Sequence, residues 1–166
     1  DGNSDLKPDL IWHKERSGTQ PGTMRDTTRG TNKYIYPALT NAEGTNSYFT
    51  SFNTDGYTIN STDNEVNGNG DTYVSWQWKC NEGTLVSNSE SGDNPAGQYQ
   101  VNTTAGFSIV VWTGTGGAGT MAHGLGAVPH FIIARNRYNS SDWLVYHHKN
   151  TSAPETDYLT MNEQDA

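Results

Sequence analysis

Cysteine and long apolar runs are the first things this 166-residue sequence lacks. Cys80 is the only cysteine, so an intrachain disulfide is impossible and a small disulfide-stapled extracellular domain is excluded. No run of 18 or more apolar residues occurs, and no basic segment leads into an apolar stretch. These absences exclude a bilayer-spanning helix and a retained signal peptide, so we expect no insertion into a membrane.

Basic and aliphatic residues are also scarce. Ten Lys and Arg oppose 18 Asp and Glu, which gives a net charge of −8 and argues against a nucleic-acid partner. Leu, Ile, Val and Phe number only 25, a share that by itself would suggest disorder. Five Trp and nine Tyr compensate, because each aromatic side chain buries a large area. We therefore expect a folded chain with an aromatic core.

Thr, Ser, Asn and Gly dominate what is present, with 69 residues among them. This composition favours strands and turns, and no segment has the 3.6-residue periodicity of an amphipathic helix. The clearest strand is 73–80, where Val74, Trp76 and Trp78 alternate with polar residues. Further strands are expected near 9–16, 106–112, 131–133 and 143–147. The sequence thus predicts an all-β fold.

Two segments that begin with proline resemble each other. Residues 8–16 match 129–137 at an offset of 121, with the Pro, an Ile and the final Arg identical. Further along, Tyr34-Ile35 matches Tyr158-Leu159 at an offset of 124. Two matches in the same order predict an internal repeat, in which 6–42 and 127–166 superpose.

The repeat predicts where modules begin and end. Residues 1–80 would be the C-terminal part of one β-sandwich module, and 105–166 the N-terminal part of the next. Residues 81–104, rich in Ser, Gly and Asn, would be a linker or a long loop. Each module would then be incomplete. Either the chain extends in both directions, or other copies of the chain complete it by strand donation.

Several segments in this order resemble a known family. They are Lys7-Pro8-Asp9-Leu10-Ile11-Trp12-His13-Lys14, Ser51-Phe52-Asn53-Thr54-Asp55-Gly56-Tyr57-Thr58-Ile59, Asp71-Thr72-Tyr73-Val74-Ser75-Trp76-Gln77-Trp78-Lys79, Gly106-Phe107-Ser108-Ile109-Val110 and His123-Gly124-Leu125-Gly126-Ala127-Val128-Pro129-His130-Phe131-Ile132-Ile133. They resemble a repeated module of tail-fibre or appendage proteins of marine tailed phages, notably cyanophages. The resemblance implies lectin-like antiparallel β-sandwiches of the jelly-roll type, located in a virion and without catalysis. The chain departs from the family at Gln77 and Cys80, where relatives often have Cys and Ala.

Two groups of side chains are candidates for contact with sugars. Trp76 and Trp78 share a face with Val74 and are expected to be core, because the chain has few aliphatic residues. The opposite face would then present Tyr73, Ser75 and Gln77 to a glycan, if that face is exposed. The second group is a polar and aromatic loop that is otherwise an ordinary turn; its members are Tyr138, Asn139, Asp142 and Trp143.

Metal and catalytic motifs are weak. Residues 63–71 carry oxygen side chains spaced as in a calcium loop, but Val74 stands where a bidentate Glu is needed, so a plain turn is favoured. His147 and His148 would point to opposite sides of a strand. The glycine-rich segment 114–119 lacks the Lys of a phosphate loop. We expect no metal, no cofactor and no enzymatic activity.

Taken together, the sequence favours a structural and adhesive module of a tailed-phage tail fibre or appendage. The expected partners are other copies of the chain, other virion proteins and a host-surface glycan. Two alternatives stay open. The chain could be a fragment of a glycan-degrading tailspike with catalytic carboxylates in its loops. It could also be a capsid decoration protein, which differs in where the module sits on the virion.

Overall fold

The computed structural model describes residues 5–89 and 91–163, and these form strands without a helix. The all-β prediction is therefore confirmed. The strands are β1 (Leu10–Glu15), β2 (Thr23–Asp26), β3 (Lys33–Tyr34), β4 (Gly44–Thr45), β5 (Phe49–Asn53), β6 (Gly56–Ile59), β7 (Tyr73–Trp78), β8 (Val86–Asn88), β9 (Gly97–Asn102), β10 (Phe107–Trp112), β11 (Phe131–Ala134), β12 (Leu144–His147) and β13 (Leu159–Thr160).

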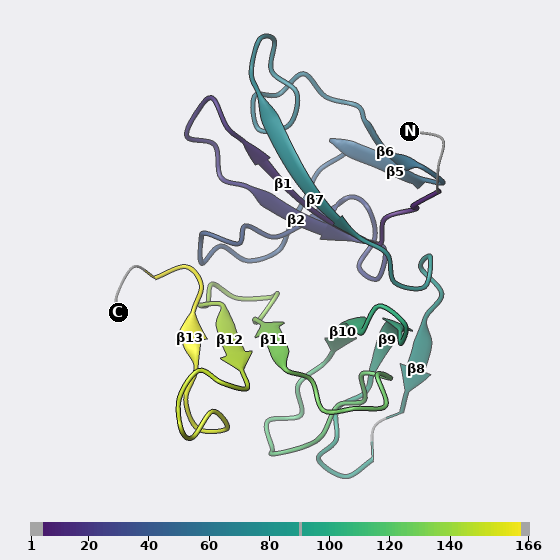
Figure 1. Ribbon diagram of the computed structural model, residues 1–166, viewed down its shortest axis with the longest axis vertical. Helices are drawn as coiled ribbons and strands as arrows, with labels where there is room; N and C mark the ends of the chain where they lie inside the picture. The colour runs from purple at the N-terminus through teal and green to yellow at the C-terminus, as the bar shows by residue number, and fades with distance from the viewer. Residues whose placement is uncertain (1–4, 90, 164–166) are drawn as a thin grey trace.

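All strand pairings are antiparallel and gather into small sheets rather than one large one. Three sheets have three strands each, in the orders β2-β1-β7, β10-β9-β8 and β11-β12-β13. The pairs β3-β4 and β5-β6 complete the set. The β2-β1-β7 sheet lies across one end of the molecule, and the other two three-stranded sheets lie beside each other below it (Figure 1). The jelly-roll arrangement stays a prediction.

The first core lies under one face of β1. Because alternate residues of a strand point to opposite sides, Ile11, His13 and Glu15 share this face, and each is buried. Ile11 packs with Phe49 and Phe52 of β5 and with Val66. The hairpin β5-β6 therefore covers the sheet on this side, using aromatic rings where aliphatic residues are few.

The second core joins the two ends of the chain. Met24 and Ile35 pack against Trp143. The indole N–H of Trp143 donates to the carbonyl of Tyr36, which lies 107 residues earlier in the chain. Leu10, Trp12, Ile133 and Met161 pack around them. The opposite face of β1 thus turns towards the β11-β12-β13 sheet, and the two proline-led segments contribute to one core.

The strand registers match the predicted repeat. In the first sheet Leu10, Ile11 and Trp12 of β1 pair with Asp26, Arg25 and Met24 of β2. Adding 121 to every number gives the pairs of β11 with β12: Phe131 with His147, Ile132 with Tyr146, and Ile133 with Val145. The next neighbour also corresponds, since Met24 bridges to Ile35 and Val145 pairs with Leu159. We call 8–35 and 129–159 the two repeat units.

The expectation of a linker at 81–104 is wrong. This segment contains β8 and β9, and β9 pairs along its whole length with β10. The expected boundary at 104/105 therefore falls in the turn of a hairpin. The polar segment is ordered because its backbone groups pair with neighbouring strands, and this pairing does not require apolar side chains.

Two buried side chains fasten this hairpin to the first sheet. The carboxylate of Asp9 accepts hydrogen bonds from the Thr27 hydroxyl at 2.6 Å and from the backbone N–H groups of Cys80 and Glu82 at 2.7 and 2.9 Å. Gln100 of β9 accepts from the backbone at Asn81 and donates to the Thr27 hydroxyl at 2.8 Å. The start of β1 and the middle of β9 are thus held together.

Candidate functional site

Tryptophan side chains are exposed where β7 and β1 face the rest of the molecule. Trp76 is 48% exposed and Trp78 is 36% exposed, so the expectation that both are core is wrong. Trp12 of β1 lies edge-on to Trp76, with ring centroids 5.8 Å apart. Trp78 stacks on Phe107 of β10 at 6.4 Å. We call these four residues the tryptophan surface.

The register of β1 and β7 assembles this surface. Trp76 lies opposite Trp12, and Trp78 lies opposite Leu10, so the rings gather on one face of the sheet. Directly paired residues in an antiparallel sheet bring their side chains close together. This face is also the one that carries the second core, and the tryptophans extend that core into solvent.

The opposite face of β7 holds the sugar-contact residues predicted from the sequence, and all three make hydrogen bonds within the protein. The Tyr73 hydroxyl donates to the carbonyl of Asn64 at 2.8 Å and accepts from the N–H of Gly68 at 2.7 Å. The Tyr57 hydroxyl donates to Ser75 at 3.0 Å. Gln77 is exposed, and its amide donates to Ser75 at 3.3 Å. The β5-β6 hairpin and the loop after it therefore occupy much of the face that the sequence predicts to be open.

The second predicted group divides between core and surface. Trp143 is buried, its indole N–H donates to the carbonyl of Tyr36 at 2.9 Å, and the Arg135 guanidinium lies 5.0 Å from its ring centre. Asp142 accepts a hydrogen bond from Asn162 at 3.0 Å. Tyr138 is 89% exposed, and Asn139 beside it is also exposed. Trp143 is thus a structural residue, and Tyr138 and Asn139 are the members open to a ligand.

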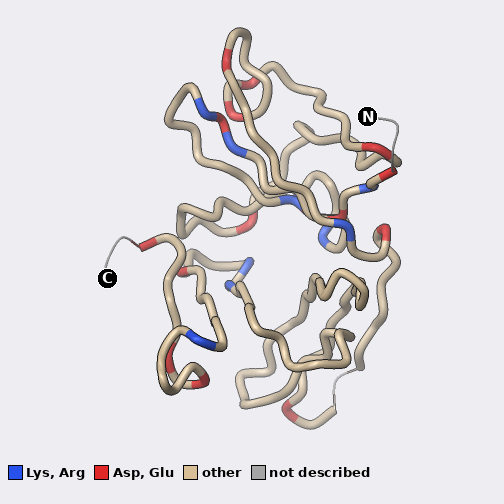
Figure 2. The backbone as a smooth tube through the Cα atoms, in the orientation of Figure 1, with Lys and Arg blue, Asp and Glu red and all other residues tan. Residues whose placement is uncertain are grey.

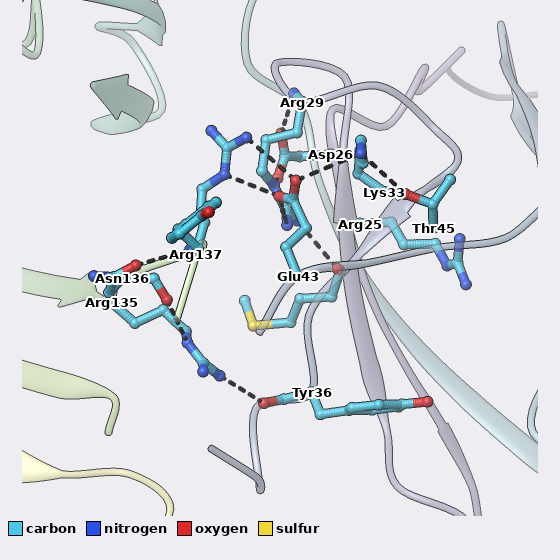
Figure 3. A network of polar contacts seen from close by, with 12 residues as sticks. Arg25, Asp26, Arg29, Lys33, Tyr36, Glu43, Thr45, Arg135, Asn136 and Arg137 are labelled. Carbon is cyan, nitrogen blue, oxygen red and sulfur yellow. Dashed lines mark hydrogen bonds and ion pairs between the residues drawn. The ribbon is translucent and has the colours of Figure 1, made fainter. Parts of the chain in front are cut away.

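Arginine side chains of the second repeat unit bind the loop that follows the first unit. Arg135 donates to the carbonyls of Leu39, Thr40 and Asn41 at 2.7–3.0 Å. The Glu43 carboxylate accepts from Arg29 at 3.1 Å and from Arg137 at 2.9 Å (Figure 3). These groups hold the loop after β3 against the end of β11. Their donors and acceptors are used within the protein, which suits a structural role.

A polar cluster is buried beneath the first sheet. Arg25 is inaccessible to solvent, and its guanidinium lies over the rings of Tyr34 and Phe49 at 5.1 and 4.7 Å. Burial, reinforced by the charge of Arg25, lowers the pKa of His13 to about 4. Burial also raises the pKa of Glu65, although the hydrogen bond from Tyr36 and the charge of Arg25 oppose this. Since His13 and Arg25 lie beneath covering residues, a substrate cannot reach them.

Within 5–89 and 91–163, no group of three or more His, Cys, Asp or Glu side chains is placed to hold a metal ion. Over the same residues no helix has the length and apolarity needed to cross a membrane. An open hollow of about 530 Å³ lies along the loop 121–129, and His123 is the titratable side chain in its lining.

Charge is distributed unevenly along the chain. Residues 94–134 contain no Lys, Arg, Asp or Glu, whereas the first sheet carries charges of both signs (Figure 2). This uncharged segment includes Phe107 of the tryptophan surface. The three tryptophans of that surface lie on the charged first sheet, so the absence of charge is confined to the Phe107 side of this surface.

The comparisons with known proteins give one match. No curated protein and no solved structure matches the chain. A sequence model of a protein family matches residues 3–166 and is described as a domain of unknown function, DUF7483. The match spans both repeat units and the hairpin between them. The chain therefore belongs to the DUF7483 family.

Proposed function

We propose that this protein is a structural and adhesive module of a tailed-phage appendage, and that its tryptophan surface binds glycans on the host. The observation that carries the proposal is the exposure of Trp76 and Trp78 on one face of a sheet. Large aromatic rings are costly to leave in water, because much apolar area stays hydrated. A ligand that covers them recovers this free energy.

Pyranose rings suit such a surface. The C–H face of a sugar is apolar and flat, and it packs against an indole ring while the sugar hydroxyls stay in water. The indole N–H adds a polar group that can donate a hydrogen bond. Trp12 and Trp76 stand edge to face at 62°, so the surface is ridged and offers more than one ring to a sugar chain.

Weak binding at each site fits a repeated module. Linked copies raise the effective concentration of the second site, so modest contacts add up to firm attachment. The exposed tryptophans lie on β7, beside the first repeat unit, so this gain would come from copies of the whole module linked along an appendage. The resemblance to phage appendage proteins supports a location in a virion.

Titration of the protein with host-surface polysaccharide, followed by tryptophan fluorescence, tests the proposal. We expect saturable quenching, and at least about tenfold weaker binding when Trp76 and Trp78 are both replaced by Ala. Trp112→Ala is the matched control. Trp112 is also 48% exposed, but it lies on the opposite side of β10 from Phe107. Equal weakening by both changes, or no binding by the unaltered protein, would contradict the proposal.

Two alternatives have different outcomes. A glycan-degrading tailspike fragment would shorten the polysaccharide, and one carboxylate substitution would abolish that activity. A capsid decoration protein would be found by labelled antibody on the capsid rather than on the tail. The buried positions of His13 and Arg25 favour adhesion over catalysis at that cluster.

A further inference from the structure

The two repeat units differ in one respect that concerns the edge of the sheet. β1 lies between β2 and β7, whereas β11 has only β12 as a neighbour among the described residues. Because β1 and β11 correspond residue by residue, the edge of β11 that has no partner corresponds to the edge of β1 that binds β7. The first repeat unit therefore shows what kind of strand fits the second.

The hydrogen-bond pattern fixes which backbone groups are free. The N–H of His148 donates to the carbonyl of His130, so bonded pairs of β11 and β12 fall at alternate residues: 130, 132 and 134. The N–H groups of Phe131 and Ile133 consequently point away from β12. Their counterparts, Leu10 and Trp12, point towards β7, as the bond from the Arg16 N–H to the Thr72 carbonyl confirms.

Side-chain exposure shows that apolar residues on both faces of β11 are also uncovered. Ile132 is 45% exposed, whereas its counterpart Ile11 is fully buried beneath the β5-β6 hairpin. Phe131 is 56% exposed. An apolar edge strand with free N–H and C=O groups is a template for pairing, and folded proteins commonly cover such an edge.

We propose that the free edge of β11 is an acceptor for a strand of the β7 type from another repeat unit. The incoming strand runs antiparallel to β11, in the register by which β7 binds β1. Its residue equivalent to Trp78 then lies opposite Phe131, and its residue equivalent to Trp76 lies opposite Ile133. Backbone hydrogen bonds hold the strand, and alternating aromatic side chains select it. This site is independent of glycan binding.

Hydrogen exchange of the whole protein with a synthetic peptide of residues 71–79 tests the proposal. In the free protein the amides of Phe131 and Ile133 exchange quickly, while that of Ile132, which bonds to β12, is protected. Saturating peptide should slow exchange at Phe131 and Ile133 by at least about tenfold and leave Ile132 unchanged. A scrambled peptide of the same composition is the control. Absence of protection at Phe131 and Ile133 would overturn the proposal.

Variants at Phe131 provide a second readout by calorimetric titration of the peptide. Phe131→Pro removes a donor on the free edge without touching the bonds to β12, so peptide binding should be lost. Phe131→Thr keeps the donor and should still bind. Equal binding by both variants would refute strand addition. If the protein alone self-associates by pairing the β11 edges of two copies, and this protects Phe131 and Ile133, the proposed occupant is wrong. Should Phe131→Pro unfold, the exchange result on the unaltered protein decides.

Discussion

At the scale of single residues, the surroundings of His13 favour its uncharged form in the folded protein. Its ring lies between Tyr73, stacked at 5.3 Å, and Phe49, edge-on at 5.7 Å. Arg25 carries a buried positive charge close by, so a second cation here is unfavourable. Burial and this charge together account for the pKa of His13 falling from 6.5 to about 4.

Stability should therefore fall in mild acid. The unfolded chain takes up a proton at His13 near pH 6.5, while the folded protein resists until about pH 4. The contribution of His13 is thus complete above pH 6.5 and is lost as the pH falls towards 4, by about 3 kcal/mol at most. We expect His13→Phe, which keeps the ring stacking, to flatten this part of the curve of unfolding free energy against pH.

Urea unfolding of both proteins between pH 7 and pH 4 provides the measurement. Glu65 has the opposite effect on stability. Its pKa is raised in the folded protein, so protonation of Glu65 stabilises the folded protein as the pH falls. The comparison of the two proteins removes that contribution and isolates His13. Parallel curves for the two proteins would show that His13 does not carry the pH dependence.

At the scale of elements, the alternating pattern located strands well but assigned faces poorly. The pattern of Val74, Trp76 and Trp78 predicts β7 correctly. It does not tell which face is covered, because both faces of β7 bear aromatic side chains. The β5-β6 hairpin lies against the Tyr73 and Ser75 side, so the tryptophans are left exposed. That outcome depends on where another element packs.

The sequence pattern does not predict β9, and the reason is different. Its residues Gln98, Tyr99, Gln100 and Val101 alternate, but a glutamine, Gln100, stands at the buried position where an apolar residue is expected. Gln100 is buried because four polar partners satisfy its amide: the N–H groups of Asn81 and Gly83, and the hydroxyls of Thr27 and Thr28. Those partners come from two distant segments, and no local pattern reveals them.

Removing this amide should loosen the β8-β9-β10 sheet from the first sheet. Gln100→Leu leaves the N–H groups of Asn81 and Gly83 without their acceptor, which should cost about 2–4 kcal/mol. Gln98→Leu is the control, because Gln98 is exposed on the same strand and should change the free energy of unfolding by about 0.5 kcal/mol or less. Chemical denaturation measures both. Similar losses for the two variants would show that the Gln100 contacts are not special.

At the scale of the whole molecule, the two repeat units pack against each other through equivalent faces. Trp12 and its counterpart Ile133 both contact the core formed by Met24, Ile35 and Trp143. The polar part of this interface is less symmetric. Arg135 donates to three carbonyls of the loop that follows the first unit, whereas the residue that corresponds to Arg135 in the first unit is Lys14.

Arg135→Lys should weaken the contact between the second repeat unit and the loop 37–42 that follows the first. A lysine ammonium cannot reproduce the planar fork that reaches the carbonyls of Leu39, Thr40 and Asn41, so we expect a loss of about 1–3 kcal/mol. Protease cleavage within 37–42 should also become faster, because this loop loses its anchor. Arg16→Lys, at an exposed position of β1's end, is the control. Unchanged unfolding and cleavage for Arg135→Lys would contradict this role.

The sequence alone determined the all-β fold, the strong strands and the repeat, because alternation and self-similarity are local properties that a chain carries in its residue order. Tertiary structure decided which tryptophans stay exposed, why Gln100 is buried, and which edge of β11 is free. These properties depend on contacts between residues far apart in the chain, such as Asp9 with Cys80 and Trp143 with Tyr36. The β5-β6 hairpin covers one face of the first sheet, and the tryptophans on the other face stay exposed to solvent. Which face is covered is decided only when these elements pack together.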